Sequence, residues 1–152
     1  MRILDTLKEE VIIAELNASD KKGVVEEIAA PMAKASGVDQ QEMVRVLLER
    51  ERLGSTGIGG GIAIPHGKLK SLDSLLVGFG RSLKGVDFEA IDGKPAHLFF
   101  LLIAPEDSTG THLRMLARIS RLLKDSTFKQ QLMTAADQHE IYTVIANEDH
   151  EF

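Results

Sequence analysis

One apolar run constrains the fold of this chain more than any other feature of its sequence. The run, Leu98 to Ala104, reads LFFLLIA and offers no polar side chain to either face of an extended segment. Side chains alternate between the two faces of a strand, so a strand with one face in water would carry a polar residue at every second position. The run therefore predicts a central strand covered on both faces, and it is far too short to span a membrane.

Apolar periodicity predicts further strands and helices on both sides of this run. Extended segments are expected at residues 11–16, 62–64 and 74–80. Helices are expected after Asp20, with a kink or early end at Pro31, then from Asp39 to Leu53, and in three pieces over residues 111–125, 126–136 and 137–147. Strands in the middle and helices at both ends predict an α/β fold, a three-layer sandwich in which helices cover both faces of a small mixed β-sheet. We expect residues 1–152 to form a single domain.

The composition excludes several classes of function. The chain has no cysteine, so disulfides, zinc ribbons and thiol nucleophiles are excluded, and its five histidines show no zinc-binding spacing. We therefore expect no metal and no organic cofactor. A formal net charge of −5 argues against a nucleic-acid partner. The N-terminus lacks the apolar core of a signal peptide, which favours a cytoplasmic protein with no membrane insertion.

The remaining charged and histidine residues are interpreted as structural or solvent-exposed. Four basic residues at helical spacing are expected to form a solvated helix face: Arg114, Arg118, Arg121 and Lys124. His97 opens the central strand and is expected to have a structural role, whereas His139 and His150 are expected to be exposed.

A glycine-rich stretch, STGIGGGIAIPHGKLK from Ser55 to Lys70, suggests at first a phosphate-binding loop. The spacing of a P-loop is not met, because five residues rather than four separate Gly61 from Gly67, and no Ser or Thr follows Lys68. The dinucleotide-binding pattern fails too, since its third glycine falls on an isoleucine. With nucleotide loops excluded, the stretch is interpreted as the setting of His66, an imidazole able to act as a nucleophile.

Two polar residues interrupt apolar stripes on the predicted helices. Arg50 falls near the centre of a stripe made by Met43, Val46, Leu47 and Leu53, while Glu49, Glu51 and Arg52 are expected to point elsewhere. His112 shares a stripe with Leu116, Ile119 and Leu123, and it lies in the first turn of its helix, where free backbone N–H groups favour an anion. Each residue alone has an ordinary structural explanation, since a buried histidine is commonly satisfied by a carbonyl and an arginine can extend to solvent.

Together with His66, these two residues fit phosphoryl transfer to an imidazole. Such a reaction requires chiefly that the protein position the nitrogen and neutralise charge on the phosphoryl oxygens. Arg50 offers a permanently charged fork for those oxygens, and His112 offers a second nitrogen that can accept or donate a proton near pH 7. We expect Ser55, Thr56 and Gly67 to lie around the phosphoryl group.

The residues that carry these predictions also match a known family. Glu51, Ile58-Gly59 and IAIPHG over residues 62–67 resemble the signature of the fructose/mannitol-type IIA components of the bacterial phosphotransferase system. STGIG and IAIPHGK are most similar to the nitrogen-regulatory branch, and the similarity extends over nearly the whole chain. Gly60 departs from the pattern, because relatives often carry asparagine or glutamate there.

The resemblance implies a fold, a reaction and roles for three residues. The implied fold is a mixed sheet between helices. His66 matches the phosphorylated histidine, which receives its phosphoryl group from a histidine-phosphocarrier protein that is itself charged by a phosphoenolpyruvate-dependent enzyme I. His112 matches the second active-site histidine of the family, and Arg50 matches its active-site arginine.

Three functions remain open at the level of the sequence. The leading hypothesis is a phosphoryl-accepting regulator, in which phosphorylation of His66 changes the regulatory target proteins that bind. The second is a sugar-transport IIA component that passes the phosphoryl group to a IIB domain. The third is a binding module that has lost phosphorylation and acts through its surface alone.

Overall fold

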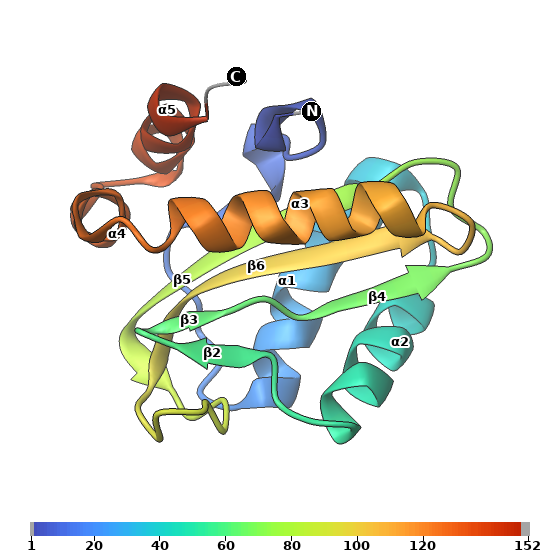
Figure 1. The fold of residues 1–152 in the computed structure, drawn as a ribbon, viewed down its shortest axis with the longest axis horizontal. Coiled ribbons are helices and arrows are strands. Elements are labelled where there is room, and N and C mark those ends of the chain that lie inside the picture. Colours follow the sequence, from blue (N-terminus) through green and yellow to red (C-terminus); the bar gives the residue numbers. More distant parts are fainter. Residues whose placement is uncertain (1, 150–152) are drawn as a thin grey trace.

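A mixed six-stranded sheet forms the centre of the protein (Figure 1). The structure is a computed structural model, and it describes residues 2–149. The strands are β1 (Ile12–Ile13), β2 (Gly57–Gly59), β3 (Ile62–Ala63), β4 (His66–Leu69), β5 (Leu76–Val86) and β6 (Ala96–Pro105). Their order in the sheet is β1-β5-β6-β3-β2, and β4 also pairs with β6.

The predicted central strand is confirmed. On one side β6 pairs antiparallel with β5, and on the other side it pairs in parallel with β3 and then with β4. Every residue from Leu98 to Ala104 is at most 2% exposed. The segments β3 and β4 lie one after the other along β6. Between them the N–H of Ile64 donates to Thr56, and the carbonyl oxygen of Pro65 accepts the N–H of Leu102 in β6 at 3.0 Å.

Helices surround the sheet, which confirms the predicted α/β class. They are α1 (Lys21–Ser36), α2 (Gln40–Arg52), α3 (Thr109–Leu122), α4 (Ser126–Thr134) and α5 (Gln138–Glu148), and two short 3-10 helices cover Ile3–Asp5 and Glu9–Val11. In Figure 1, α3 crosses in front of the sheet while α1 and α2 lie behind it. Among residues 2–149, no helix is both long and apolar enough to cross a membrane.

Aspartate side chains mark the starts of four helices. Asp20, Asp39, Asp125 and Asp137 each accept a hydrogen bond from a backbone N–H in the first turn of the helix that follows. The expected early end at Pro31 is wrong, because α1 continues to Ser36 and stops at Gly37, whose φ of +77° is left-handed. Residues on either side of the proline, Ile28 and Met32, are buried against the core, and this packing compensates for the hydrogen bond that proline cannot donate.

The strands differ from the sequence prediction mainly in their ends. β1 has two residues where a strand over residues 11–16 is expected, and β5 continues six residues beyond the predicted 74–80. The apolar pattern does not predict β2 or β4 at all. Both are short, and pairing with β3 and β6 rather than their own residue pattern holds them in the sheet.

Glycine on β5 allows α1 to pack closely against the sheet. A Cβ atom on Gly80 would lie 2.7 Å from Cδ1 of Ile28 and 3.0 Å from Cδ1 of Leu16, and both of these side chains are fully buried. The neighbouring Phe79 points to the other face, where its ring packs edge-on against Phe100 at 4.9 Å. The alternation of small and large residues on β5 therefore sets the distance between α1 and the sheet.

Substitution of this glycine tests the packing. We expect Gly80→Ala to lower the free energy of unfolding by about 1 to 3 kcal/mol, because the new methyl group overpacks the contact with Ile28. Gly110→Ala in α3 is the matched control, since the nearest atom to its Cβ is 3.7 Å away, and we expect it to stabilise the protein by about 0.5 to 1 kcal/mol. Urea unfolding measures both, and equal stability of the two variants would contradict this account.

Candidate functional site

The strand β4 places His66 at an open edge of the sheet, between α2 and α3. Gly67 faces α2, because a Cβ atom there would lie 3.3 Å from Cγ2 of Val46. Since side chains alternate along a strand, His66 and Lys68 project toward the opposite face, where α3 lies. His66 pairs in register with Leu102 of the central strand, so the most buried element of the sheet holds its backbone.

His66 and His112 meet at this edge. Their ring centroids are 5.4 Å apart, and the rings are perpendicular. Beside them, Lys68 donates a hydrogen bond of 2.6 Å from Nζ to Oγ1 of Thr109 in the first turn of α3. The predicted inward direction of His112 is confirmed, since the residue is only 5% exposed and Ile119 and Leu123 of its stripe are buried.

The backbone fixes the tautomer of His66. Its Nδ1 lies 2.8 Å from the carbonyl oxygen of Ile64. A carbonyl can only accept a hydrogen bond, so Nδ1 carries the proton and Nε2 keeps a lone pair in the neutral ring. Burial lowers the pKa of His66 below its ordinary value, which favours the neutral ring at pH 7. The site therefore presents an unprotonated Nε2.

The neutral form of the His112 ring is favoured more strongly than that of His66. Burial lowers its pKa to about 4, and the nearby His66 and Lys68 add to the effect. Its Nδ1 is buried and has no hydrogen-bond partner within residues 2–149. A buried unpaired polar atom costs about 1 to 3 kcal/mol, a cost typical of residues kept for function rather than for stability.

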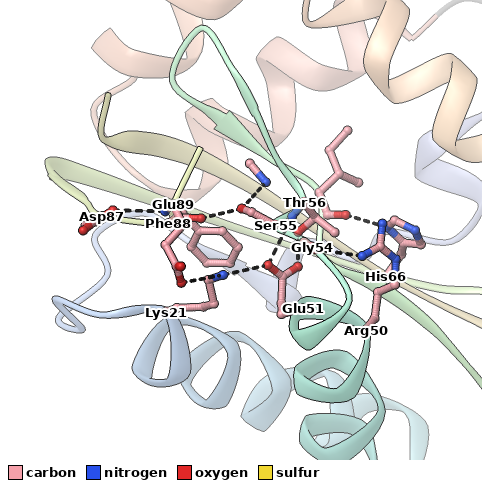
Figure 2. A network of polar contacts seen from close by, with 12 residues as sticks. Lys21, Arg50, Glu51, Gly54, Ser55, Thr56, His66, Asp87, Phe88 and Glu89 are labelled. Carbon is pink, nitrogen blue, oxygen red and sulfur yellow. Dashed lines mark hydrogen bonds and ion pairs between the residues drawn. The ribbon is translucent and has the colours of Figure 1, made fainter. Parts of the chain in front are cut away.

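Arg50 lies beside His66 at the end of α2. Its Nη1 donates a hydrogen bond of 2.8 Å to the carbonyl oxygen of Gly54 (Figure 2). The predicted apolar stripe through Arg50 is only partly confirmed, because Met43 and Leu47 are buried whereas Leu53 is 85% exposed. The last turn of α2 is buried on one side, at Glu51, whereas Arg50 is half-buried and borders the same surface hollow as His66.

These side chains line one shallow surface hollow. It is bordered by Val46, Glu49, Arg50, Leu53, His66, Gly67, Lys68 and His112. Three basic or ionisable side chains, Arg50 from α2, Lys68 from β4 and His112 from α3, thus surround His66. An anion held at Nε2 of His66 would have positive charge on two sides and the first turn of α3 beside it.

The buried charge on α2 is Glu51, not Arg50. The expectation that Glu51 points away from the core is wrong, since its side chain is only 3% exposed. It accepts hydrogen bonds from the backbone N–H of Thr56 at 3.1 Å and from the Thr56 hydroxyl, and it pairs with Lys21 at 3.1 Å (Figure 2). Helical periodicity misses this residue, because its partners come from other segments of the chain.

Two of the residues expected around the phosphoryl group direct their side chains elsewhere. The Ser55 hydroxyl donates to the carbonyl oxygen of Phe88 and accepts the N–H of Gly57 at 3.0 Å, and the Thr56 hydroxyl binds Glu51. Neither side chain borders the hollow. Gly67 does border it, directly after His66.

Gly60 lies at the turn between β2 and β3, away from the hollow. Its φ is +67°, its N–H donates to Asp92 at 3.0 Å, and its carbonyl oxygen accepts from Nζ of Lys129 at 3.3 Å. A Cβ atom there would lie 3.2 Å from the same Nζ. A polar side chain at this position would therefore meet Lys129 in this chain rather than border the hollow around His66.

His97, His139 and the basic face of α3 lie apart from the site. His97 bonds through Nδ1 to the carbonyl oxygen of Ser82 at 2.9 Å, His139 is exposed beside Glu9, and His150 lies outside the described residues. Arg114, Arg121 and Lys124 are exposed as expected, whereas Arg118 is 11% exposed and pairs with Asp149 at 2.8 Å. Within the described part of the chain, no group of three or more His, Cys, Asp or Glu residues is placed to hold a metal ion.

The low pKa of His112 predicts a specific loss of stability in acid. Its pKa is about 4 in the folded protein and about 6.5 in the unfolded chain, so between these values only the unfolded chain binds the proton. The free energy of unfolding therefore falls as the pH drops from 6.5 to 4, by up to about 1.4 kcal/mol per pH unit from this residue. We expect His112→Leu to show a shallower fall than wild type in urea unfolding across this range. Parallel curves would contradict the assignment.

Comparison with known proteins identifies relatives of the chain over almost its full length. It is 42% identical over 146 residues to a nitrogen regulatory protein of Bradyrhizobium diazoefficiens, covering 96% of this chain and 95% of that protein. It is also 39% identical over 150 residues to the fructose-specific EIIABC component of the phosphotransferase system of Bacillus subtilis. That match covers 98% of this chain and 24% of the Bacillus protein.

Structural and family comparisons agree with these relatives. The crystal structure of the nitrogen regulatory protein IIA-Ntr from Neisseria meningitidis superposes with a TM-score of 0.87 at 32% identity, covering 93% of this chain and 97% of that one. A family model described as "Phosphoenolpyruvate-dependent sugar phosphotransferase system, EIIA 2" matches residues 5–148. The resemblance seen in the signature residues is thus confirmed, and the chain belongs to the EIIA 2 family of the phosphoenolpyruvate-dependent sugar phosphotransferase system.

Proposed function

We propose that the chain is a phosphoryl carrier that is phosphorylated on Nε2 of His66 and regulates other proteins through its phosphorylation state. The observation that carries this proposal is the hydrogen bond from Nδ1 of His66 to Ile64, which leaves Nε2 unprotonated on a residue that borders an open hollow. Membership of the family and the nitrogen regulatory relatives support it. The phosphoryl donor is a histidine-phosphocarrier protein.

In this reaction a phosphoryl group passes between two imidazoles. The lone pair on Nε2 of His66 forms the new P–N bond, the P–N bond of the donor phosphohistidine breaks, and the donor ring leaves with the electron pair and takes up a proton. The His66 Nδ1–H bond to Ile64 is kept throughout, so the ring does not have to reorient. The protein contributes position and charge rather than covalent chemistry.

The groups around the hollow stabilise the transferred phosphoryl group. Arg50 and Lys68 bring positive charge, and the α3 N-terminus adds backbone N–H groups that no side chain caps, because the Ser108 hydroxyl donates instead to the carbonyl of Pro105. The phosphoryl charge also favours a second proton on the His112 ring, whose two nitrogens can then both donate hydrogen bonds.

The surface around the hollow suits protein partners. Leu53 borders the hollow and is 85% exposed, and Leu113, which follows His112 in α3, is 60% exposed. Phosphorylation adds a charge of about −1.5 to −2 at the centre of this partly apolar surface, so a target that packs over an uncharged His66 is released when the group is added. Regulation then follows from a local change in charge.

Direct labelling tests the proposed acceptor. Because Nε2 of His66 has an available lone pair, we expect phosphoenolpyruvate, enzyme I and the phosphocarrier protein together to phosphorylate the wild type. The bound phosphate should be stable in base and labile in acid. His66→Gln is expected to remain unlabelled while unfolding at about the wild-type urea concentration. Labelling of His66→Gln, or none on the wild type, would contradict the proposal, and the second result would favour a binding module without phosphorylation.

A second test concerns Arg50. We expect Arg50→Met to slow phosphoryl transfer by about 10- to 150-fold, the equivalent of a charge-assisted contact of about 1.5 to 3 kcal/mol. Its free energy of unfolding is expected to change by less than about 1 kcal/mol, because the side chain is half-buried and makes one hydrogen bond to the backbone. Arg45→Met on the exposed face of α2 is the control and should transfer at the wild-type rate. Phosphoryl transfer by Arg50→Met at the wild-type rate would show that Arg50 has no role in the reaction.

Sugar transport is the second candidate, and the similarity to the fructose-specific component of Bacillus subtilis favours it. In that case phosphorylated His66 donates its phosphoryl group to a IIB domain. Incubation of the phosphorylated protein with sugar-specific IIB partners distinguishes the two functions. Rapid loss of phosphate from His66 to a IIB partner supports transport, whereas stable phosphate with intact loading by the phosphocarrier supports regulation.

A further inference from the structure

Glu51 is a buried carboxylate on α2, next to Arg50 in the sequence, and it takes no part in the transfer step described above. Glu51 is surrounded by donors, namely the N–H and hydroxyl of Thr56 and Nζ of Lys21 (Figure 2). Lys21 is itself anchored, since it pairs with Glu89 at 3.2 Å and lies 5.0 Å from the ring centroid of Phe88. Burial of a carboxylate is costly unless such partners surround it. The position of Glu51 therefore depends on three other segments, at Lys21, at Thr56 and at Phe88–Glu89.

A chain of hydrogen bonds leads from Glu51 to the imidazole. Glu51 holds Thr56, the carbonyl oxygen of Thr56 accepts the N–H of Ile64 at 3.1 Å, and the carbonyl oxygen of Ile64 accepts Nδ1–H of His66 at 2.8 Å. Ile64 lies in the break between β3 and β4, where its N–H donates to Thr56 rather than to β6. The next residue, Pro65, has no N–H to donate. The carbonyl that fixes His66 therefore depends on Thr56 for its position.

We propose that Glu51 is a positioning residue for His66, and that it acts through Thr56 and Ile64 to keep the imidazole in the Nδ1–H tautomer. Loss of this support lets the ring adopt the Nε2–H tautomer, which has no lone pair on the nitrogen that faces the hollow. The effect on phosphoryl transfer rests on the proposed function, but the tautomer can be measured on the protein alone.

Electrostatics gives Glu51 a second influence on the same ring. Burial lowers the pKa of His66, and the positive charge of Arg50 lowers it further, whereas the negative charge of Glu51 raises it. Adjacent residues of α2 thus act on His66 in opposite directions. Removal of the Glu51 charge is therefore expected to lower the pKa of His66 still more.

The test measures the tautomer of His66 by ¹⁵N NMR of the histidine rings, above the pKa of His66. We expect the wild type to be almost entirely Nδ1–H, and Glu51→Gln to show a substantial Nε2–H fraction with phosphoryl transfer slowed on the order of 10- to 100-fold. Thr56→Val removes one of the two hydrogen bonds from Thr56 to Glu51 and should shift the tautomer less. Thr56→Ser keeps the hydroxyl and should retain the wild-type tautomer.

One further variant serves as a control and another as a replacement if Glu51→Gln does not fold. Glu42→Gln lies on the same helix, is exposed and pairs with Arg45, so both readouts should match the wild type. If Glu51→Gln does not fold, the double variant Lys21→Met/Glu51→Gln removes the unpaired ammonium as well and is used in its place. A folded Glu51 variant with the wild-type tautomer would overturn the inference. A shifted tautomer in a protein whose wild type is never phosphorylated would support the inference and overturn the proposed function.

Discussion

The function proposed here depends on one hydrogen bond, from Nδ1 of His66 to the carbonyl oxygen of Ile64. It decides which nitrogen carries the proton, and therefore which nitrogen can attack phosphorus. It also depends on the fold, because Ile64 lies where the pairing of β3 with β6 stops and before that of β4 begins. Ile64 donates its N–H to Thr56, and the N–H of Thr56 donates to Glu51 rather than back to Ile64, so the Ile64 carbonyl is available to a side chain.

The sheet and the helices determine what surrounds that bond. The central strand β6 holds β4 in register, and the alternation of β4 sends Gly67 toward α2 and His66 toward α3. His112 then meets His66 from the first turn of α3, and Arg50 approaches from the end of α2. Three elements that are far apart in the sequence thus supply the nucleophile, a neutral histidine and a fixed positive charge.

Much of this arrangement could be predicted from the sequence, because the signals are local. The run at Leu98–Ala104 predicts the central strand, the aspartates predict the helix starts, and the stripe through His112 predicts its burial. The direction of Arg50 and the burial of Glu51 could not be predicted in this way. Both depend on where α2 ends relative to the edge of the sheet and on donors from Thr56 and Lys21, which helical periodicity does not contain.

The most direct test of the account is the position of the phosphoryl group on the ring. Phosphorylation of the protein with ¹⁵N-labelled histidine, followed by NMR of the phosphorylated ring, identifies the nitrogen bonded to phosphorus. The hydrogen bond to Ile64 predicts that phosphorus is bonded to Nε2 of His66 and that Nδ1 keeps its proton. Phosphorus bonded to Nδ1 would contradict the account, because that product cannot form while Nδ1–H donates to Ile64.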